Sequence, residues 1–135
     1  MSDIRNLEPK LLWKYFYEIT QIPRPSKKEK AMTEYMKKFG KEHGIETIVD
    51  DTGNVILRKP ATKGMENRKG IILQGHLDMV PQKNSDKVFN FEKDPIETRI
   101  DSGWVKANGT TLGADNGVGV AAAMAAMTDP KVVHG

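Results

Sequence analysis

The stretch from Asn116 to Met127 constrains the fold more than any other, because it consists almost entirely of Val, Ala, Met and Gly. A helix that is apolar all round must be buried by neighbouring elements on every side. Its small side chains would let a sheet approach closely. Asp129-Pro130 ends this helix, and residues 132–135 have the pattern of an approach to a further strand. A buried central helix so near position 135 predicts that the sequence is the opening segment of a larger domain.

Two earlier segments carry apolar residues at helical spacing. Pro9 opens the first, since proline is tolerated in the first turn of a helix. Ser26 and Glu29 precede the second and form a capping-box signature. The apolar stripes recur at i, i+3, i+4 and i+7, and consist of Leu12, Tyr15, Phe16 and Ile19 in the first helix and of Met32, Tyr35, Met36 and Phe39 in the second.

Strands are predicted between these helices. Residues 45–49 and 55–58 form one hairpin, joined by a turn rich in Asp, Gly and Asn. Ile71-Ile72-Leu73 is a continuous apolar run, which is typical of a strand buried on both faces. Alternation over residues 96–106 predicts a second hairpin around Asp101-Ser102-Gly103. We therefore predict an α/β fold, a mixed sheet flanked by helices.

The composition limits the chemistry of any site. A chain of 135 residues with 29% charged residues suits one modest globular domain. The net charge of +3 comes from basic residues dispersed among acidic ones, which argues against nucleic-acid binding. There is no cysteine, so His, Asp and Glu must hold any metal. No apolar run is long enough to span a bilayer and the sequence shows no signal-peptide core, so we expect no membrane partner and a cytoplasmic location.

A histidine and an acidic residue follow the apolar run at residues 71–73. Residues two apart on a strand project from the same side, so His76 and Asp78 can act together. A ligating imidazole needs its second nitrogen held by a partner, often a carboxylate. Asp78 is therefore the catalytic candidate, either orienting His76 or acting on a metal-bound water. The alternative is a solvated pair at the end of a strand.

Asp115 lies between a glycine- and threonine-rich loop and the apolar helix. It is predicted either to cap that helix or to bind metal as a bridging carboxylate, stabilised by the positive end of the helix. Residues 117–122 also match the dinucleotide pattern G-x-G-x-x-A. That pattern should directly follow a hydrophobic strand, and here it does not. We expect its glycines to permit close helix–sheet packing instead.

The sequence around these residues resembles that of the M20-type zinc peptidases, particularly the aminoacyl-histidine dipeptidases, also called Xaa-His or β-alanyl-histidine dipeptidases. The resemblance runs nearly end to end. Two separated motifs, one around His76 and one around Asp115, occur in the right order. The matching segments are Leu73 to Lys83, Asp94 to Ile96, Trp104 to Gly117, Ile22 to Ser26 and Asp51 to Asn54.

The resemblance implies a role for each candidate. His76 would ligate one zinc ion, Asp115 would bridge two, and Asp78 would orient His76. The Asp115–Asn116 peptide would be cis. The complete site would hold two zinc ions, or other divalent metals, that activate water to hydrolyse a dipeptide ending in histidine. The full-length parent would be a homodimer.

The resemblance also places several parts beyond position 135: the general-base glutamate, the remaining ligands, the lid and dimerisation domain, and the C-terminal catalytic half. Residues 1–135 are thus expected to be the N-terminal portion of a zinc-peptidase (aminopeptidase-like) catalytic domain. Three ligand-type residues cannot hold and tune two zinc ions, so we expect no hydrolysis by this chain alone. The alternatives are a non-catalytic metal-binding or interaction fragment, or another M20-type amidohydrolase or tripeptidase.

Overall fold

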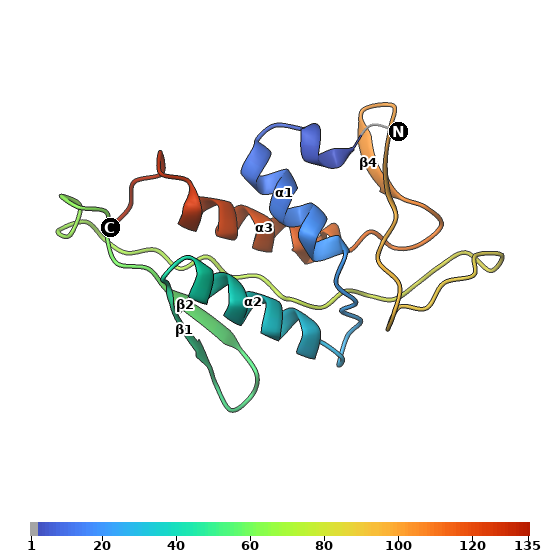
Figure 1. The fold of residues 1–135 in the computed structure, drawn as a ribbon, viewed down its shortest axis with the longest axis horizontal. Coiled ribbons are helices and arrows are strands. Elements are labelled where there is room, and N and C mark those ends of the chain that lie inside the picture. The colour runs from blue at the N-terminus through green and yellow to red at the C-terminus, as the bar shows by residue number, and fades with distance from the viewer. Residues whose placement is uncertain (1–2) are drawn as a thin grey trace.

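Three helices form the centre of the molecule. The computed structural model describes residues 3–135. α1 and α3 lie side by side, and α2 lies beneath them in the view of Figure 1. A short 3-10 turn precedes α1. The bounds are Ile4–Asn6 for this turn, Lys10–Thr20 for α1, Lys30–Glu42 for α2 and Ala114–Thr128 for α3.

The apolar stripes of α1 and α2 form the core, as their spacing predicts. Tyr15, Phe16 and Ile19 are buried on α1, and Leu12 is half-buried. The Tyr15 ring meets Phe39 of α2 edge-to-face at 5.5 Å between centroids, which joins the two helices. The remaining buried residues of the α2 stripe are Met32 and Met36.

The predicted capping box is wrong. Glu29 precedes α2 without a side-chain cap, and the Ser26 hydroxyl is used elsewhere. It donates a hydrogen bond to the Asp78 carboxylate at 2.5 Å. A hydrogen bond to a charged acceptor is stronger than one between neutral groups, so the carboxylate competes successfully for this hydroxyl.

α3 is buried on one face only within residues 3–135. α1 packs on α3, with Phe16 beside Gly117, and Gly75 lies beside the buried Val120, whereas Gly119 and Ala122 are exposed. The prediction that every side of this helix is covered is therefore not met by the described part of the chain. No sheet among the described residues covers the second face.

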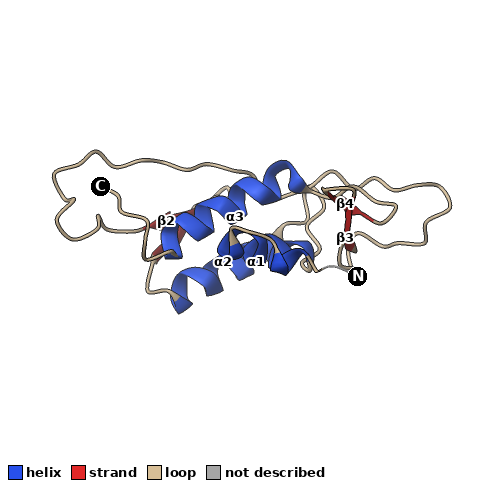
Figure 2. Ribbon diagram, turned by 90° about the horizontal axis from the view of Figure 1, so that it is seen from above, coloured by secondary structure: helices blue, strands red, loops and turns tan. Residues whose placement is uncertain are grey.

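The four strands form two separate antiparallel hairpins, at opposite ends of the molecule (Figures 1 and 2). In the first, Thr47 pairs with Leu57. In the second, Ser102 and Gly103 take positive φ values of 53° and 82°, the geometry of a tight hairpin turn. The strands are β1 (Glu46–Val49), β2 (Val55–Arg58), β3 (Thr98–Asp101) and β4 (Trp104–Ala107). The predicted hairpins are thus confirmed, but they do not join into one mixed sheet within residues 3–135.

The predicted buried strand at residues 71–73 is wrong. Ile71 is 71% exposed and Ile72 is 94% exposed, and the segment pairs with no strand in the described part of the chain. A strand requires a hydrogen-bonded neighbour, and an apolar pattern alone does not supply one. These residues belong to the extended segment, residues 59–97, which contains no helix or strand and runs past the helices in Figure 1.

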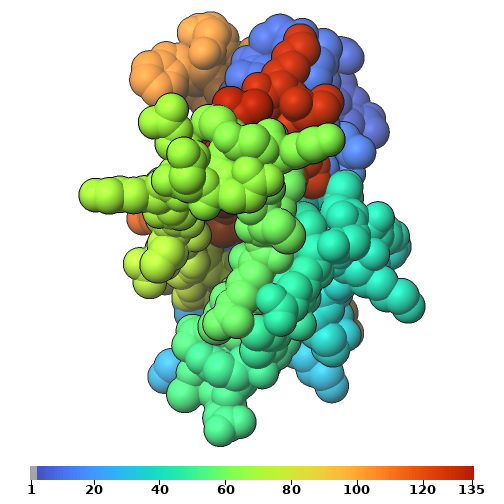
Figure 3. Space-filling view, turned by 90° about the vertical axis from the view of Figure 1, so that its left-hand side faces the viewer, coloured from blue at the N-terminus to red at the C-terminus, as the bar shows by residue number. Residues whose placement is uncertain are grey.

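The extended segment is tied down near its start by the C-terminal residues. The Thr62 amide donates to the His134 carbonyl at 2.9 Å, and the His134 amide donates to the Thr62 hydroxyl at 3.0 Å. Figure 3 shows the two regions in contact on this face. None of the helices in residues 3–135 has both the length and the apolarity to cross a membrane.

Candidate metal centre

The three side chains singled out from the sequence meet at one place. His76 Nδ1 lies 2.9 Å from Asp78 Oδ1, and His76 Nε2 lies 3.0 Å from Asp115 Oδ1. The first pair comes from the extended segment, and Asp115 comes from the start of α3. A residue 39 positions away in the sequence therefore completes the cluster.

The two carboxylates occupy opposite edges of one imidazole ring. A neutral imidazole can donate through only one nitrogen, whereas the protonated ring donates through both. Hydrogen bonding to Asp115, and then to Asp78, raises the pKa of His76 above its ordinary value. Because the side chain of His76 is 50% exposed and that of Asp115 is 94% exposed, solvent screens this effect.

Asp78 is fixed from two sides. The Ser26 hydroxyl donates to its Oδ2, and His76 meets its Oδ1. The hydrogen bond from Ser26, together with His76, lowers the pKa of Asp78 below its ordinary value. Asp78 therefore stays ionised at neutral pH and can keep a proton on the Nδ1 atom of His76.

Asp115 does not act as the helix cap. Among the described residues, no backbone amide of α3 donates to the Asp115 carboxylate, whose partner is His76 Nε2. Asp115 and Asn116 have non-helical backbone angles, which turn the Asp115 side chain toward His76. The Asp115–Asn116 peptide is cis, as the family resemblance implied.

One residue of the site has no role in the sequence analysis. Arg24 is 2% exposed and touches both backbone segments of the site. Its guanidinium donates to the carbonyls of Leu77, Asp78 and Gly113. The sequence gives only a weak signal for Arg24: it lies between Pro23 and Pro25, in a segment that resembles the family but to which the resemblance assigns no function.

The predicted helix–sheet packing by the glycines after Asp115 is wrong, because Phe16 of α1 and Arg24 lie against Gly117 instead of a sheet, and the dinucleotide interpretation also fails. These glycines lie inside α3, and no strand leads into them. A Cβ at Gly117 would lie 2.8 Å from Arg24 Nη2 and 3.1 Å from Phe16 Cε2. A Cβ at Gly119 would lie 1.9 Å from Asn116 Oδ1. Gly117 therefore packs closely against two other elements, whereas Gly119 is exposed and meets only a side chain of its own helix.

The donor atoms suit zinc as one part of a larger ligand set. An imidazole nitrogen and a carboxylate oxygen are both zinc ligands, and they face each other here. Asp78 lies on the other edge of the ring, so an ion between His76 Nε2 and Asp115 would not reach it. No group of three or more His, Asp or Glu side chains within residues 3–135 is arranged to hold a metal ion.

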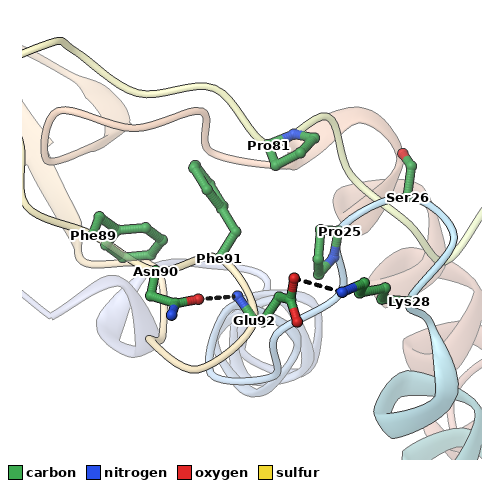
Figure 4. Close-up of a pocket in the computed structure, with 8 residues that line it drawn as sticks. All are labelled: Pro25, Ser26, Lys28, Pro81, Phe89, Asn90, Phe91 and Glu92. Atoms are coloured by element: carbon green, nitrogen blue, oxygen red, sulfur yellow. Dashed lines mark hydrogen bonds and ion pairs between the residues drawn. The ribbon is translucent and has the colours of Figure 1, made fainter.

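An open hollow of about 400 Å³ adjoins the site (Figure 4). It shares Ser26 with the cluster, because that hydroxyl binds Asp78. The rings of Phe89 and Phe91 meet edge-to-face at 4.7 Å, and Lys28 forms an ion pair with Glu92 at 2.6 Å. Apolar walls and one ion pair therefore lie beside the cluster. The remaining lining residues are Pro25, Pro81 and Asn90.

Comparison with known proteins places the chain beside peptidases. It is 55% identical over 135 residues to the cytosol non-specific dipeptidase of Escherichia coli, covering all of this chain and 28% of that protein. Its structure matches the aminoacylhistidine dipeptidase of Vibrio alginolyticus with a TM-score of 0.97 and 50% identity, over 99% of this chain and 27% of that one. It also matches the aminopeptidase PepT of Bacillus cereus, with a TM-score of 0.71 and 27% identity, over 87% of this chain and 31% of that one.

These matches confirm the resemblance to aminoacyl-histidine dipeptidases and the fold class, a combination of helices and small sheets shared with peptidases. The chain spans a little over a quarter of the length of its two more similar relatives. No protein-family model matches it.

Proposed function

We propose that this chain forms one part of the active site of a metal-dependent dipeptidase, with His76 and Asp115 as zinc ligands. The observation that carries the proposal is the 3.0 Å contact between His76 Nε2 and Asp115 Oδ1. Two residues far apart in the sequence bring zinc-binding atoms to one exposed point. The relatives of this chain have peptidase names, which supports hydrolysis as the reaction.

Each residue has a separate task. His76 would hold a metal ion through Nε2, and Asp115 would hold it through its carboxylate. Asp78 accepts the Nδ1 proton of His76, which fixes the ring and leaves Nε2 free to bind. When bound, zinc acts as a Lewis acid that activates water and polarises a carbonyl group.

We propose dipeptides as substrates, including those that end in histidine. The name of the Vibrio relative specifies aminoacyl-histidine dipeptides, whereas that of the Escherichia coli relative is non-specific. We also propose a cytoplasmic location, in line with the latter name, and a homodimeric parent protein without nucleic-acid or membrane partners. Another peptidase of the same superfamily is the second candidate. The match to an aminopeptidase favours it, at the lower identity of 27%.

The isolated chain is proposed to bind metal weakly and to be inactive. Residues 1–135 would act as the N-terminal portion of the catalytic domain. Structural zinc sites take four ligands and catalytic sites three from the protein, whereas His76 and Asp115 supply two. The other ligands and the general base would come from residues beyond position 135. The alternative, a non-catalytic metal-binding fragment, makes the same prediction for this chain and differs only for the longer protein.

Calorimetric titration with Zn²⁺, combined with a dipeptide assay, tests the proposal. We expect weak binding that is lost in His76→Ala and in Asp115→Asn. The matched control His43→Gln changes a histidine at the end of α2 and should leave binding intact. Binding that survives both site substitutions would refute the ligand assignment. Turnover of alanyl-histidine by the chain, abolished by a chelator, would refute its inactivity.

A further inference from the structure

Arg24 is a charged side chain buried at the point where the two halves of the site meet. Its Nη1 donates to the carbonyls of Leu77 and Asp78 at 3.1 and 3.0 Å. Its Nη2 donates to the carbonyl of Gly113 at 2.6 Å. One guanidinium thus connects the segment that carries His76 to the turn that carries Asp115.

The backbone of the same residue strengthens this connection. The Met79 amide donates to the Arg24 carbonyl at 3.0 Å, and the Ser26 amide donates to the Met79 carbonyl at 3.1 Å. Residues 24–26 therefore run beside residues 77–79. Met79 is 3% exposed, whereas Val80 next to it is 62% exposed, so the extended segment dips into the core at this point.

Burial of the charged Arg24 side chain costs desolvation free energy, which its hydrogen bonds must offset. Desolvation lowers the pKa of Arg24 to about 10, although the negative charge of Asp78 opposes that change. The group therefore remains charged at neutral pH. It forms no ion pair within 4 Å among the described residues, and its partners are main-chain carbonyls. A rigid planar fork can reach several carbonyls at fixed angles, which lysine cannot do.

Two glycines make room for the guanidinium. A Cβ at Gly113 would lie 2.5 Å from Nη2, and one at Gly117 would lie 2.8 Å from the same atom. Gly113 also has φ at 72°, which favours glycine. The turn before α3 is thus shaped around this side chain, on both sides of Asp115.

We propose that Arg24 is a positioning residue, which holds the backbone of residues 77–78 against the carbonyl of Gly113 so that His76 and Asp115 meet. The importance of Arg24 for metal binding rests on the function proposed above, whereas its effect on the distance between His76 and Asp115 does not depend on that function. The competing explanation is that Arg24 supports the fold as a whole and has no special effect on the site.

Nuclear Overhauser contacts in the metal-free chain separate the two explanations. The wild-type chain should show contacts between the ring protons of His76 and the Asp115 side chain. Arg24→Met removes all donors, and Arg24→Lys keeps the charge but not the fork. In both variants we expect these contacts to disappear, while the cross-strand contacts between Thr47 and Leu57 persist. The matched control Arg68→Met alters an exposed arginine and should change neither set.

Titration with Co²⁺ alone adds a second measurement with a spectroscopic signature. Loss of a partner that orients metal ligands typically weakens metal affinity about 10- to 100-fold, and we expect this range for both Arg24 variants. Absence of Co²⁺ binding by the wild-type chain would contradict the proposed function, and the Overhauser contacts would still decide the role of Arg24. Persistence of the His76–Asp115 contacts in a folded Arg24 variant would overturn the inference. Global unfolding of both variants would also overturn it, because Arg24 would then support the whole fold.

Discussion

The helical centre and the extended segment show opposite ways of organising apolar residues in one chain. In the centre, Phe16 is fully buried and Tyr15 packs against a neighbouring helix. In the extended segment, Ile72 is 94% exposed although it is as apolar as any core residue. The site lies where the two regions meet, at Arg24. The comparison teaches that apolar character stabilises a segment only where the chain also supplies a partner surface.

The largest expected effect tests this comparison directly. Phe16→Ala should lower the free energy of unfolding by about 3–5 kcal/mol, because it leaves a cavity between α1 and α3. Ile72→Ala is the matched control in the extended segment and should change it by less than about 0.5 kcal/mol. Urea unfolding followed by circular dichroism measures both. Similar losses in the two variants would show that residues 71–73 are buried in solution, contrary to the structure.

A second pair of substitutions compares two glycines with positive φ. Gly113→Ala forces a Cβ against Arg24 Nη2 in a backbone conformation with φ at 72°, whereas Gly64→Ala, with φ at 87°, meets nothing within 4 Å. The backbone conformation alone costs about 1–2 kcal/mol in each variant. Overpacking should add about 1–3 kcal/mol for Gly113→Ala only. Equal destabilisation in the same urea experiment would mean that the turn can move away from Arg24.

The pH dependence of stability gives a smaller effect at the site itself. The pKa of His76 is raised in the folded state, so His76 contributes fully to folding stability below its unfolded pKa of 6.5. This contribution is lost as the pH rises through the pKa of the folded state. The lowered pKa of Asp78 means that its contribution is present above 3.8 and is lost as pH falls through the folded value. Both contributions therefore coexist between about pH 4 and 6.5.

His76→Gln tests this pH window. The wild-type chain should exceed the variant in free energy of unfolding by more at about pH 5.5 than at about pH 8.5. The difference should stay below about 1 kcal/mol, because these side chains are well exposed and solvent screens them. A larger difference at the alkaline end would contradict the contact between His76 and the two carboxylates.

The smallest effect concerns the ion pair that links Lys28, just before α2, to Glu92 of the extended segment. Its side chains are 58% and 55% exposed. Lys28→Met should therefore cost less than about 0.5 kcal/mol, and added salt should remove even that. Lys38→Met, which breaks an exposed pair within α2, is the control for losing a lysine. Surface substitutions without a specific role usually change the free energy of unfolding by less than about 0.5 kcal/mol. A loss above about 1 kcal/mol in Lys28→Met would therefore show that this pair holds the two regions together.

The sequence predicts those features that depend on neighbours along the chain. Helical spacing identifies the buried faces of α1 and α2, and turn residues identify both hairpins. The run at residues 71–73 fails as a predictor because a buried strand depends on partners elsewhere. Ser26 fails in the same way: its local pattern indicates a helix cap, but a distant carboxylate takes its hydroxyl.

The residues of the candidate site likewise fall into those that local motifs predict and one that depends on distant partners. The motifs around His76 and Asp115 identify the three side chains that meet, since the family resemblance implied that these residues act together. Arg24 is invisible to this reasoning, because its three acceptors are backbone carbonyls and lie more than 50 positions away. Main-chain acceptors leave no mark in the residue types of a sequence.

The space around the Arg24 guanidinium links three positions that are distant in the chain. A shorter residue at position 24 would vacate the volume into which a methyl group at 113 or 117 would otherwise intrude. Substitution at these positions should thus be interdependent during sequence drift: an alanine at 117 meets both Arg24 and Phe16, so it requires a change at position 24 and a small shift of Phe16. Aligned descendants of this gene would then show Gly117 kept wherever the arginine is kept, and Gly113 kept in either case because of its positive φ.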